Sequence, residues 1–213
     1  MTKAIIIVAG GKGLRMGGDI PKQFLVVKGK PILMHTIERF KAFDPTIQIV
    51  VVLPKDQQGY WHQLCQDYHF DVPIDIVDGG AERFYSVKNG LAAVTPEAQL
   101  IGVHDGVRPY VAIDVIRRCY EAAAAEGAAI PVVDIVETLR HITSDGSHTV
   151  PRSEYKLVQT PQVFQADILR RAYEQPFNPS FTDDASVVEA IDQRITLVEG
   201  NRENIKITTK SDL

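Results

Sequence analysis

The sequence predicts an α/β fold with a mostly parallel central sheet, and two patterns along the chain support this prediction. Short runs of β-branched and other apolar residues alternate with stretches in which apolar residues recur every three or four positions. Runs that are apolar throughout are typical of strands buried on both faces, and amphipathic stretches between them are typical of the helices that cover a parallel sheet. The predicted strands are residues 4–8, 47–53, 74–77, 100–104 and 128–133.

Amphipathic spacing places the helices between these strands. Apolar residues follow the period of one helix face over residues 33–43, 61–68, 84–94 and 113–123. Crossovers between parallel strands are right-handed, and ligands of such sheets bind beyond the carboxyl ends of the strands. We therefore expect the functional residues directly after the predicted strands.

The alternation ends near residue 134, and a polar segment follows. Ser144-Asp145-Gly146-Ser147 stands between β-prone residues 138–142 and 148–150, which is the pattern of a hairpin. An isolated two-stranded ribbon is marginally stable in water. We therefore expect this protruding β-arm, residues 136–152, to lie on a second subunit or, alternatively, to fold back on its own domain.

The C-terminal part predicts two more helices and two more strands. Helical stretches are expected near residues 166–173 and 183–191, with Thr182 as the N-cap of the second. Residues 195–198 and 205–208 are strand-like. Because no repeat, low-complexity tract or linker interrupts the chain, we expect a single domain over residues 1–213 that carries the arm.

Composition excludes several classes of function. The 213 residues carry a formal net charge of −4, which argues against a nucleic-acid binder that works through bulk charge. No apolar run is long enough to span a bilayer and no secretory signal is recognisable, so we expect a cytoplasmic protein without a membrane partner. Cys65 and Cys119 form no CxxC motif, and both fall on apolar helix stripes, which predicts buried small hydrophobes rather than a disulfide or a zinc site.

The first candidate motif follows the first predicted strand and reads Ala9-Gly10-Gly11-Lys12-Gly13. Small residues let backbone N–H groups wrap a polyphosphate. The frame of a P-loop is absent, and a dinucleotide fingerprint lacks its third glycine because Met16 occupies that position. A nicotinamide enzyme is therefore disfavoured.

Two cations follow this loop, Arg15 and then Lys22 in Pro21-Lys22-Gln23. A guanidinium forks onto phosphate oxygens, and an ammonium adds a point charge. The alternative is that both are ordinary surface cations near a turn, but their position after the first strand favours a role in anion binding.

The second motif, Gly79-Gly80-Ala81-Glu82-Arg83-Phe84-Tyr85-Ser86, joins a predicted strand to a helix. Arg83 and Ser86 are three positions apart and share a helix face beside the helix N-terminus. This face could equally be a solvated polar face that binds no ligand.

The third motif contains Asp105 and Arg108, again at the carboxyl end of a strand. These two residues could hold sugar hydroxyls, a phosphate or a metal-bound triphosphate, or they could pair with each other. His104 is expected to be a hydrogen-bonded structural residue rather than a general base. Lys206 lies inside the last predicted strand, where we expect it to face an anion.

Glycines and cations dominate these motifs, and the patterns of the common hydrolases are missing. No Ser-His-Asp pattern, HExxH motif or pair of acids at a telling spacing occurs in the sequence. This balance suits phosphoryl or nucleotidyl transfer, in which an enzyme mainly positions its reactants and neutralises developing charge.

Taken together, the motifs resemble the 2-C-methyl-D-erythritol 4-phosphate cytidylyltransferase family of the non-mevalonate isoprenoid pathway. The resemblance extends from about residue 3 to the C-terminus, and its motifs occur in family order: AGGKGLRM, PKQF, GGAERFYSV, HDGVRP, PVVDIVETL, QTPQVF, TDDASVVE and VEGNRENIKIT. Ribitol 5-phosphate cytidylyltransferases share the opening motif, so ribitol 5-phosphate is an alternative acceptor. A non-catalytic nucleotide-binding module is a second alternative.

The resemblance implies a Rossmann-like nucleotide-diphosphosugar transferase fold that acts as a homodimer. It also implies transfer of CMP from CTP to a polyol phosphate, with Mg²⁺ as cofactor and no protein ligand of the metal identified. By matching positions, the residues around CTP are Ala9, Gly10, Gly11, Gly13, Gly80, Arg83 and Ser86. Those that stabilise the transition state are Arg15 and Lys22. Those that hold the acceptor are Asp105, Arg108, Thr138, Thr160 and Thr182, with Lys206 and Arg152 on its phosphate and Arg152 reaching across the dimer from the arm.

Overall fold

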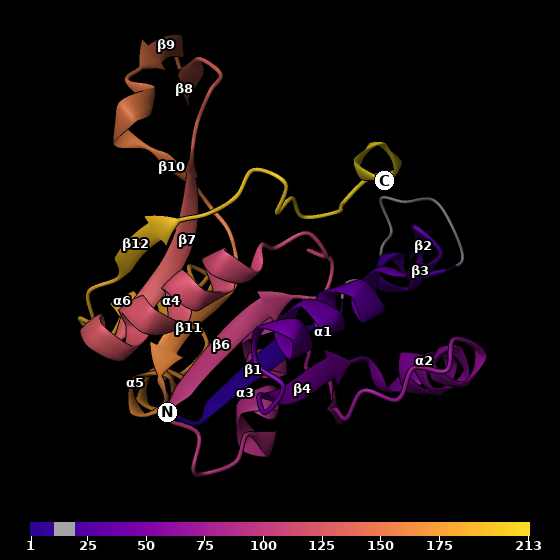
Figure 1. Ribbon diagram of the computed structural model, residues 1–213. Coiled ribbons are helices and arrows are strands. Elements are labelled where there is room, and N and C mark those ends of the chain that lie inside the picture. Colours follow the sequence, from indigo (N-terminus) through magenta and orange to yellow (C-terminus); the bar gives the residue numbers. More distant parts are fainter. Residues whose placement is uncertain (11–19) are drawn as a thin grey trace.

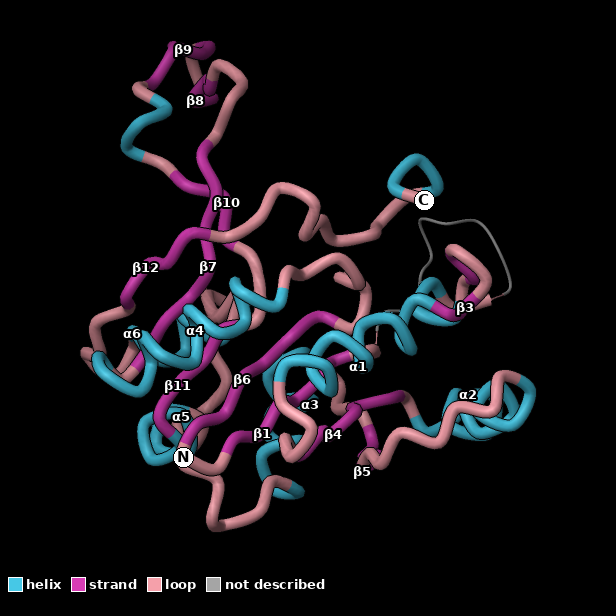
Figure 2. Tube along the Cα trace, in the orientation of Figure 1, coloured by secondary structure: helices cyan, strands magenta, loops and turns pink. Residues whose placement is uncertain are grey.

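A central eight-stranded sheet organises the computed structural model, which describes residues 1–10 and 20–213 (Figures 1 and 2). Its strands are β1 (Lys3–Val8), β4 (Gln48–Leu53), β5 (Asp75–Asp78), β6 (Leu100–Asp105), β7 (Ala128–Asp134), β10 (Lys156–Val158), β11 (Gln162–Gln165) and β12 (Thr196–Glu199). The helices are α1 (Ile32–Phe43), α2 (Lys55–Asp67), α3 (Arg83–Ala93), α4 (Ile113–Glu126), α5 (Ala166–Ala172) and α6 (Asp184–Glu189). Smaller elements are the ribbon of β2 (Val26–Val27) and β3 (Lys30–Pro31) and the 3₁₀ turns η2 (Lys22–Phe24), η3 (Arg152–Glu154) and η4 (Lys210–Asp212).

The sheet is mostly parallel, as the sequence predicts, with strand order β10-β7-β11-β6-β1-β4-β5 and β12 paired to β7. Strands β4, β5 and β6 run parallel with β1 or its neighbour, and β12 runs parallel with β7. Strand β11 is antiparallel to β6 and β7, and β10 is antiparallel to β7. The carboxyl ends of β1, β4, β5 and β6 therefore meet at one edge of the sheet.

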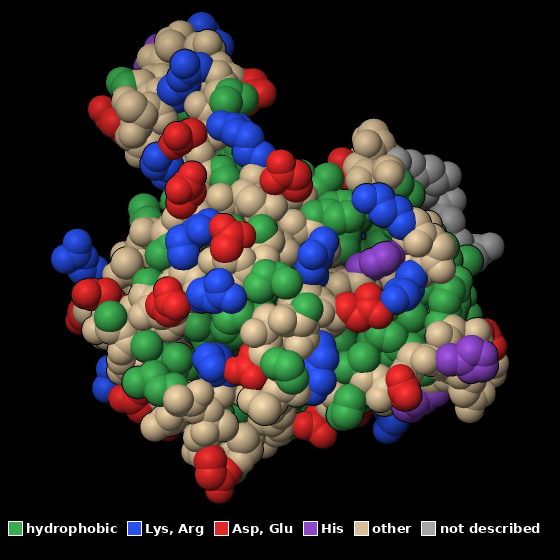
Figure 3. Space-filling model, in the orientation of Figure 1, with side chains coloured by type: hydrophobic (Ala, Val, Ile, Leu, Met, Phe, Trp, Pro, Cys, Tyr) green, Lys and Arg blue, Asp and Glu red, His purple; other side chains and the backbone are tan. Residues whose placement is uncertain are grey.

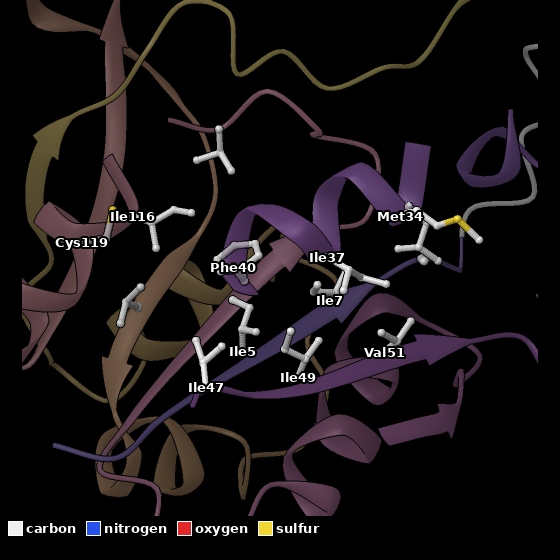
Figure 4. Packing of buried hydrophobic residues seen from close by; sticks show 14 of the residues in the cluster. Ile5, Ile7, Met34, Ile37, Phe40, Ile47, Ile49, Val51, Ile116 and Cys119 are labelled. Carbon is white, nitrogen blue, oxygen red and sulfur yellow. The ribbon is translucent and has the colours of Figure 1, made fainter. Parts of the chain in front are cut away.

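Alternate residues of β1 enter two separate hydrophobic clusters, which explains why the run is apolar throughout. Ile5 and Ile7 pack with residues of α1, α2 and α4 on one face, where Figure 4 shows them beneath Ile37 and Phe40. Ile6 packs with residues of α3, α5 and α6 on the other face. The sheet is thus the middle layer of three. The helices cover its two faces, and the edge at the carboxyl ends of β1, β4, β5 and β6 is where we look for the functional site.

The prediction that Thr182 caps the last α-helix is wrong, because the N-cap of α6 is Asp183. The Asp183 carboxylate accepts the Ser186 backbone N–H at 2.9 Å, and the Ser186 hydroxyl oxygen accepts the Asp183 N–H at 3.2 Å. Asp183 has a serine three positions later that completes this reciprocal capping box, and Thr182 does not. Thr182 instead lies one residue before the N-cap.

The prediction of a strand over residues 205–208 is also wrong. Ile207 donates its backbone N–H to the Val107 carbonyl at 3.0 Å and buries its side chain beside Val27 and Ile32, but no ladder forms in this stretch. Strands β10 and β11 were in turn not predicted, since each is short and flanked by polar residues or proline. The C-terminal segment runs from β12 across the carboxyl edge of the sheet (Figure 1, yellow).

The predicted hairpin forms from β8 (Leu139–Thr143) and β9 (Gly146–Val150). Gly146 has a φ of +139°, a conformation that suits glycine at the end of the tight turn. Among the described residues the two strands pair with each other and stand away from the sheet (Figure 1), so the arm does not fold back on its own domain. Most of its residues are exposed, and Ile142 keeps 73% of its surface in solvent.

The surface carries mixed charge. Acidic and basic side chains are interspersed over the face drawn in Figure 3, and no single sign dominates it. Within the described ranges, no helix is both long and apolar enough to cross a bilayer.

Candidate functional site

A pocket of about 260 Å³ opens at the carboxyl edge of the sheet, where β1 and β6 end and α3 begins. Three of the motifs noted in the sequence reach it, together with the C-terminal segment. Its described lining residues are Val8, Ala9, Gly10, Lys22, Gln23, Gly80, Ala81, Glu82, Arg83, Ser86, Asp105, Val107 and Lys206.

Two glycines shape the wall of the pocket in different ways. A Cβ atom at Gly10 would meet no atom of the described residues within 4 Å, so none of them crowds the main chain there. A Cβ atom at Gly80 would lie 2.4 Å from Cβ of Tyr85, so only glycine allows this loop to close on the first turn of α3. The Gly80 N–H then donates to the Ser86 hydroxyl at 3.0 Å, which fixes the loop against the helix.

Asp105 is the charged centre of the inner wall. Its Oδ2 atom accepts from Nε of Arg108 at 3.0 Å and lies 3.2 Å from Nζ of Lys206. Burial alone would raise the pKa of Asp105, but Lys206, Arg83 and Arg108 together hold this pKa well below its usual range. The carboxylate is therefore ionised at neutral pH. Lys206 faces an anion, as the sequence predicts, and in this structure the anion is Asp105.

His104 lies directly behind Asp105 and is fully buried. Its Nε2 atom is 3.2 Å from the Arg108 carbonyl, which can only accept, so Nε2 carries the proton. In the neutral ring Nδ1 then accepts from the Thr160 hydroxyl at 2.8 Å, and the Thr160 oxygen accepts the Asp105 N–H at 3.1 Å. Burial lowers the pKa of His104 to about 4. The ring is thus a neutral structural group, in agreement with the expectation from sequence.

Arg83 is held at the opposite wall by a buried carboxylate. Its Nη2 atom donates to Asp184 at 2.6 Å, and the Tyr173 hydroxyl donates to the other oxygen of Asp184 at 2.6 Å. Burial lowers the pKa of Arg83, but the charge of Asp184 outweighs it and raises that pKa overall. Arg83 therefore stays charged and oriented while its side chain still reaches the pocket.

The structure brings most of the described candidate residues together. Eight of them line the pocket: Ala9, Gly10, Lys22, Gly80, Arg83, Ser86, Asp105 and Lys206. Arg108 and Thr160 lie one layer behind, bonded to Asp105. Three candidates lie outside it within the same chain: Thr138 and Thr182 are exposed, and Arg152 stands at the base of the arm, where it donates to the Val136 carbonyl. Three more, Gly11, Gly13 and Arg15, lie outside the described residues.

Sequence reasoning missed several residues of the site. Gln23, Glu82 and Val107 also line the pocket. Each stands in the same sequence motif as a predicted site residue, and this proximity is the signal that could have identified them. Asp184 was noted only as part of TDDAS, and its pairing with Arg83, 101 positions away, has no local signature.

The arrangement suits a ligand with several negative charges. Lys22, Arg83 and Lys206 line the same pocket as Gly10 and Gly80 and as the acidic residues Glu82 and Asp105. The described residues contain no cluster of three or more His, Cys, Asp or Glu side chains that would hold a metal ion by itself. Such a pocket can neutralise phosphates and orient polar hydroxyls.

Comparison with known proteins identifies the family. The family profile of 2-C-methyl-D-erythritol 4-phosphate cytidylyltransferase matches residues 3–213. The enzyme of that name from Bacteroides thetaiotaomicron is 63% identical over 213 residues, which cover 100% of this chain and 97% of the relative.

Solved structures agree with this match. The 4-diphosphocytidyl-2C-methyl-D-erythritol synthase of Anaerococcus prevotii superposes with a TM-score of 0.84 at 29% identity, covering 99% of this chain and 92% of that one. The 2-C-methyl-D-erythritol 4-phosphate cytidylyltransferase of Thermus thermophilus gives a TM-score of 0.81 at 32% identity, covering 100% and 95%. The fold is thus that of these cytidylyltransferases, and the chain belongs to the 2-C-methyl-D-erythritol 4-phosphate cytidylyltransferase family.

Proposed function

We propose that this protein transfers the cytidylyl group of CTP to 2-C-methyl-D-erythritol 4-phosphate and releases pyrophosphate. The observation that carries the proposal is the convergence of Lys22, Arg83 and Lys206 on one pocket in a chain that matches the family over its whole length. We treat residues 1–213 as one nucleotidyltransferase domain.

The two substrates enter from different sides of the pocket. Ala9, Gly10, Gly80, Arg83 and Ser86 border the proposed CTP side. No described residue crowds the main chain at Gly10, which supports a close approach of the triphosphate. Residues 11–15 carry the rest of this motif, with Gly11, Gly13 and the proposed catalytic residue Arg15, and they lie outside the described residues.

The acceptor side is built around Asp105. Lys206 and Asp105 border it, and Arg108 and Thr160 fix the orientation of the Asp105 carboxylate and main chain. Thr138, Thr182 and Arg152 are proposed to contact the acceptor only when a second subunit or the bound substrates complete the site.

In the proposed reaction, an oxygen of the acceptor phosphate attacks the α-phosphorus of CTP and forms a P–O–P bridge. The bond between the α-phosphorus and the oxygen that bridges it to the β-phosphorus breaks. Pyrophosphate leaves with this oxygen and with the electron pair of the broken bond. The attacking phosphate is largely ionised at neutral pH, so the step needs no general base. The neutral, fully engaged ring of His104 is consistent with this. Lys22 and Arg15 are proposed to offset charge that grows on the transferred phosphate and on the departing pyrophosphate.

A divalent cation, Mg²⁺ in our proposal, fits the described residues. Mg²⁺ bound with a nucleotide is usually held by phosphates, water and one or two carboxylates, and Glu82 offers a carboxylate on the pocket wall, whereas Asp105 already pairs with Arg108 and Lys206. When bound there, the ion would add positive charge at the phosphates.

The arm supports a homodimer. Six large apolar side chains of the arm and the adjacent sheet edge are exposed: Val136, Ile142, Tyr155, Leu157, Val158 and Leu197. A second copy that covers them would remove these groups from water. It would also allow Arg152, which lies outside the pocket of its own chain, to reach the acceptor phosphate in the partner's pocket.

The activity is tested by a pyrophosphate-release screen across four nucleoside triphosphates and several polyol phosphates. We expect release with CTP and 2-C-methyl-D-erythritol 4-phosphate. Preference for ribitol 5-phosphate would overturn the acceptor assignment. Binding of CTP without any release would favour a non-catalytic module.

The role of Arg152 across the dimer is tested by mixing two inactive variants, Lys22→Ala and Arg152→Ala. If Arg152 serves the partner's pocket, a mixed dimer holds one intact site, and activity returns to about a quarter of the wild-type value after subunit exchange. If Arg152 serves its own chain, every site stays defective and no activity returns. Size-exclusion chromatography with light scattering checks the dimer directly.

A further inference from the structure

Lys206 reaches the pocket from a segment without regular secondary structure. It lies on the C-terminal stretch after β12, yet its Nζ atom stands 3.2 Å from Asp105. A lysine side chain has many rotamers, and an irregular segment adds backbone freedom, so this placement requires another source of order.

Asn204, two residues earlier, is fully buried and supplies that order. Its side-chain Nδ2 donates to the Thr160 carbonyl at 2.8 Å and lies 3.4 Å from Oε1 of Gln159. The main-chain carbonyl of Asn204 accepts from Nη1 of Arg108 at 2.8 Å and from the side-chain amide of Gln159 at 3.3 Å. One residue thus ties the C-terminal segment to the loop after β6 and to the entry of β11.

The orientation of both side-chain amides follows from their partners. Nδ2 of Asn204 faces two oxygen acceptors, and Nε2 of Gln159 faces the carbonyls of Asn204 and Asn201. Flipping either amide would place oxygen against oxygen. Gln159 also needs Gly200 beside it, because a Cβ atom at Gly200 would lie 2.3 Å from Oε1 of Gln159.

The other side of Lys206 is fixed as well. Ile207 is fully buried, and its N–H donates to the Val107 carbonyl. Lys206 therefore lies between two anchored residues while its own side chain stays 43% exposed at the pocket. The two anchoring residues, Asn204 and Ile207, are thus buried, and the Lys206 ammonium group between them is accessible to a ligand.

We propose that Asn204 is a positioning residue that holds Lys206 on the acceptor phosphate, with Gln159 completing the anchor. The inference rests on the proposed role of Lys206 in acceptor binding. Asn204 touches neither substrate in this account and acts through Lys206. Loss of its amide leaves the Asn204 carbonyl available to Arg108, so the principal effect falls on the lysine.

The test is a double-mutant cycle with Asn204→Ala and Lys206→Met, in which the KM for each substrate, kcat and the melting temperature are measured. We expect Asn204→Ala to raise the KM for 2-C-methyl-D-erythritol 4-phosphate about tenfold, with the KM for CTP changed less than about twofold. In the Lys206→Met background, Asn204→Ala should add less than about twofold, because the two residues act as one unit.

A matched control and a second variant keep the result interpretable. Gln165→Ala removes an amide that bonds Ala123 and Ala124 carbonyls near the amino end of β6, and it should lower the melting temperature without moving the acceptor KM. Asn204→Leu fills about the same volume, removes the amide and introduces no charge, so it serves if the alanine variant does not fold.

The failures are distinguishable. An unchanged acceptor KM in folded Asn204 variants, equal rises for both substrates, or additive effects in the cycle would each overturn the positioning role. If Lys206→Met itself leaves the acceptor KM unchanged, the proposed function of Lys206 fails first, and the inference fails with it.

Discussion

The buried His104 ring gives a quantitative link between pH and stability. Its pKa falls from an ordinary 6.5 to about 4 in the folded chain, with burial as the largest cause. Between these values the unfolded chain binds more protons than the folded one, so stability decreases as the pH is lowered through this window. At about 1.4 kcal/mol per pKa unit, we expect His104 to contribute about 3 kcal/mol at pH 7 that is lost by pH 4.

The assay is urea unfolding at pH 7 and at pH 4 for the wild type and for His104→Gln. The variant removes the titrating group but keeps a side chain that can both donate and accept, and Asp105 is present in both proteins. The difference in free energy of unfolding between wild type and variant should shift by about 3 kcal/mol between the two pH values, in favour of the variant at pH 4. An equal difference at both values would refute the assignment of a buried neutral ring.

Three further predictions concern the pocket and the core. Lys22→Ala should lower kcat about 10²-fold in a protein that still folds, as measured by pyrophosphate release; near-normal turnover would remove Lys22 from the mechanism. Asp184→Asn should weaken CTP binding about tenfold in calorimetry, because Arg83 loses the carboxylate that orients it; unchanged affinity would contradict this. Gly90→Ala should destabilise the protein by about 1–3 kcal/mol, since its Cβ would lie 2.6 Å from Ile6. Gly59 lies in α2, and a Cβ atom there would meet no atom of the described residues within 4 Å. Gly59→Ala should therefore stabilise the protein by about 0.5–1 kcal/mol, measured like Gly90→Ala by urea unfolding. A more stable Gly90→Ala than Gly59→Ala variant would contradict the packing described for these two glycines.

The buried strands and amphipathic helices were predictable because their patterns are local. Residues 4–8 are apolar on both faces, and β1 is indeed covered by helices on both sides. The edge elements were less predictable. Residues 205–208 alternate like a strand, but the surrounding chain offers the segment one backbone bond at Val107 rather than a ladder. Strand β11 has only four residues, and its pairing with β6 and β7 comes from the topology of the sheet.

The position of the pocket was predictable because its motifs directly follow strands of the sheet. Gly80, Arg83 and Asp105 reach the same pocket because β5 and β6 end at the same edge. The supporting contacts were not predictable, since Asp184 pairs with Arg83 across 101 residues of sequence and Asn204, which anchors the segment of Lys206, bonds Arg108 across 96 residues. The N-cap of α6 shows the same limit at short range, because Thr182 and Asp183 are both good caps and only the partner Ser186 decides between them.

The central claim is that cations at the carboxyl edge of the sheet hold a nucleotide and a phosphorylated acceptor side by side. A crystal structure with a non-hydrolysable CTP analogue and 2-C-methyl-D-erythritol 4-phosphate tests it most directly. We predict that the triphosphate lies along the main chain at Gly10 within reach of Lys22, with Lys206 on the acceptor phosphate. A nucleotide bound elsewhere, or Lys22 and Lys206 turned to bulk solvent in the complex, would contradict the account.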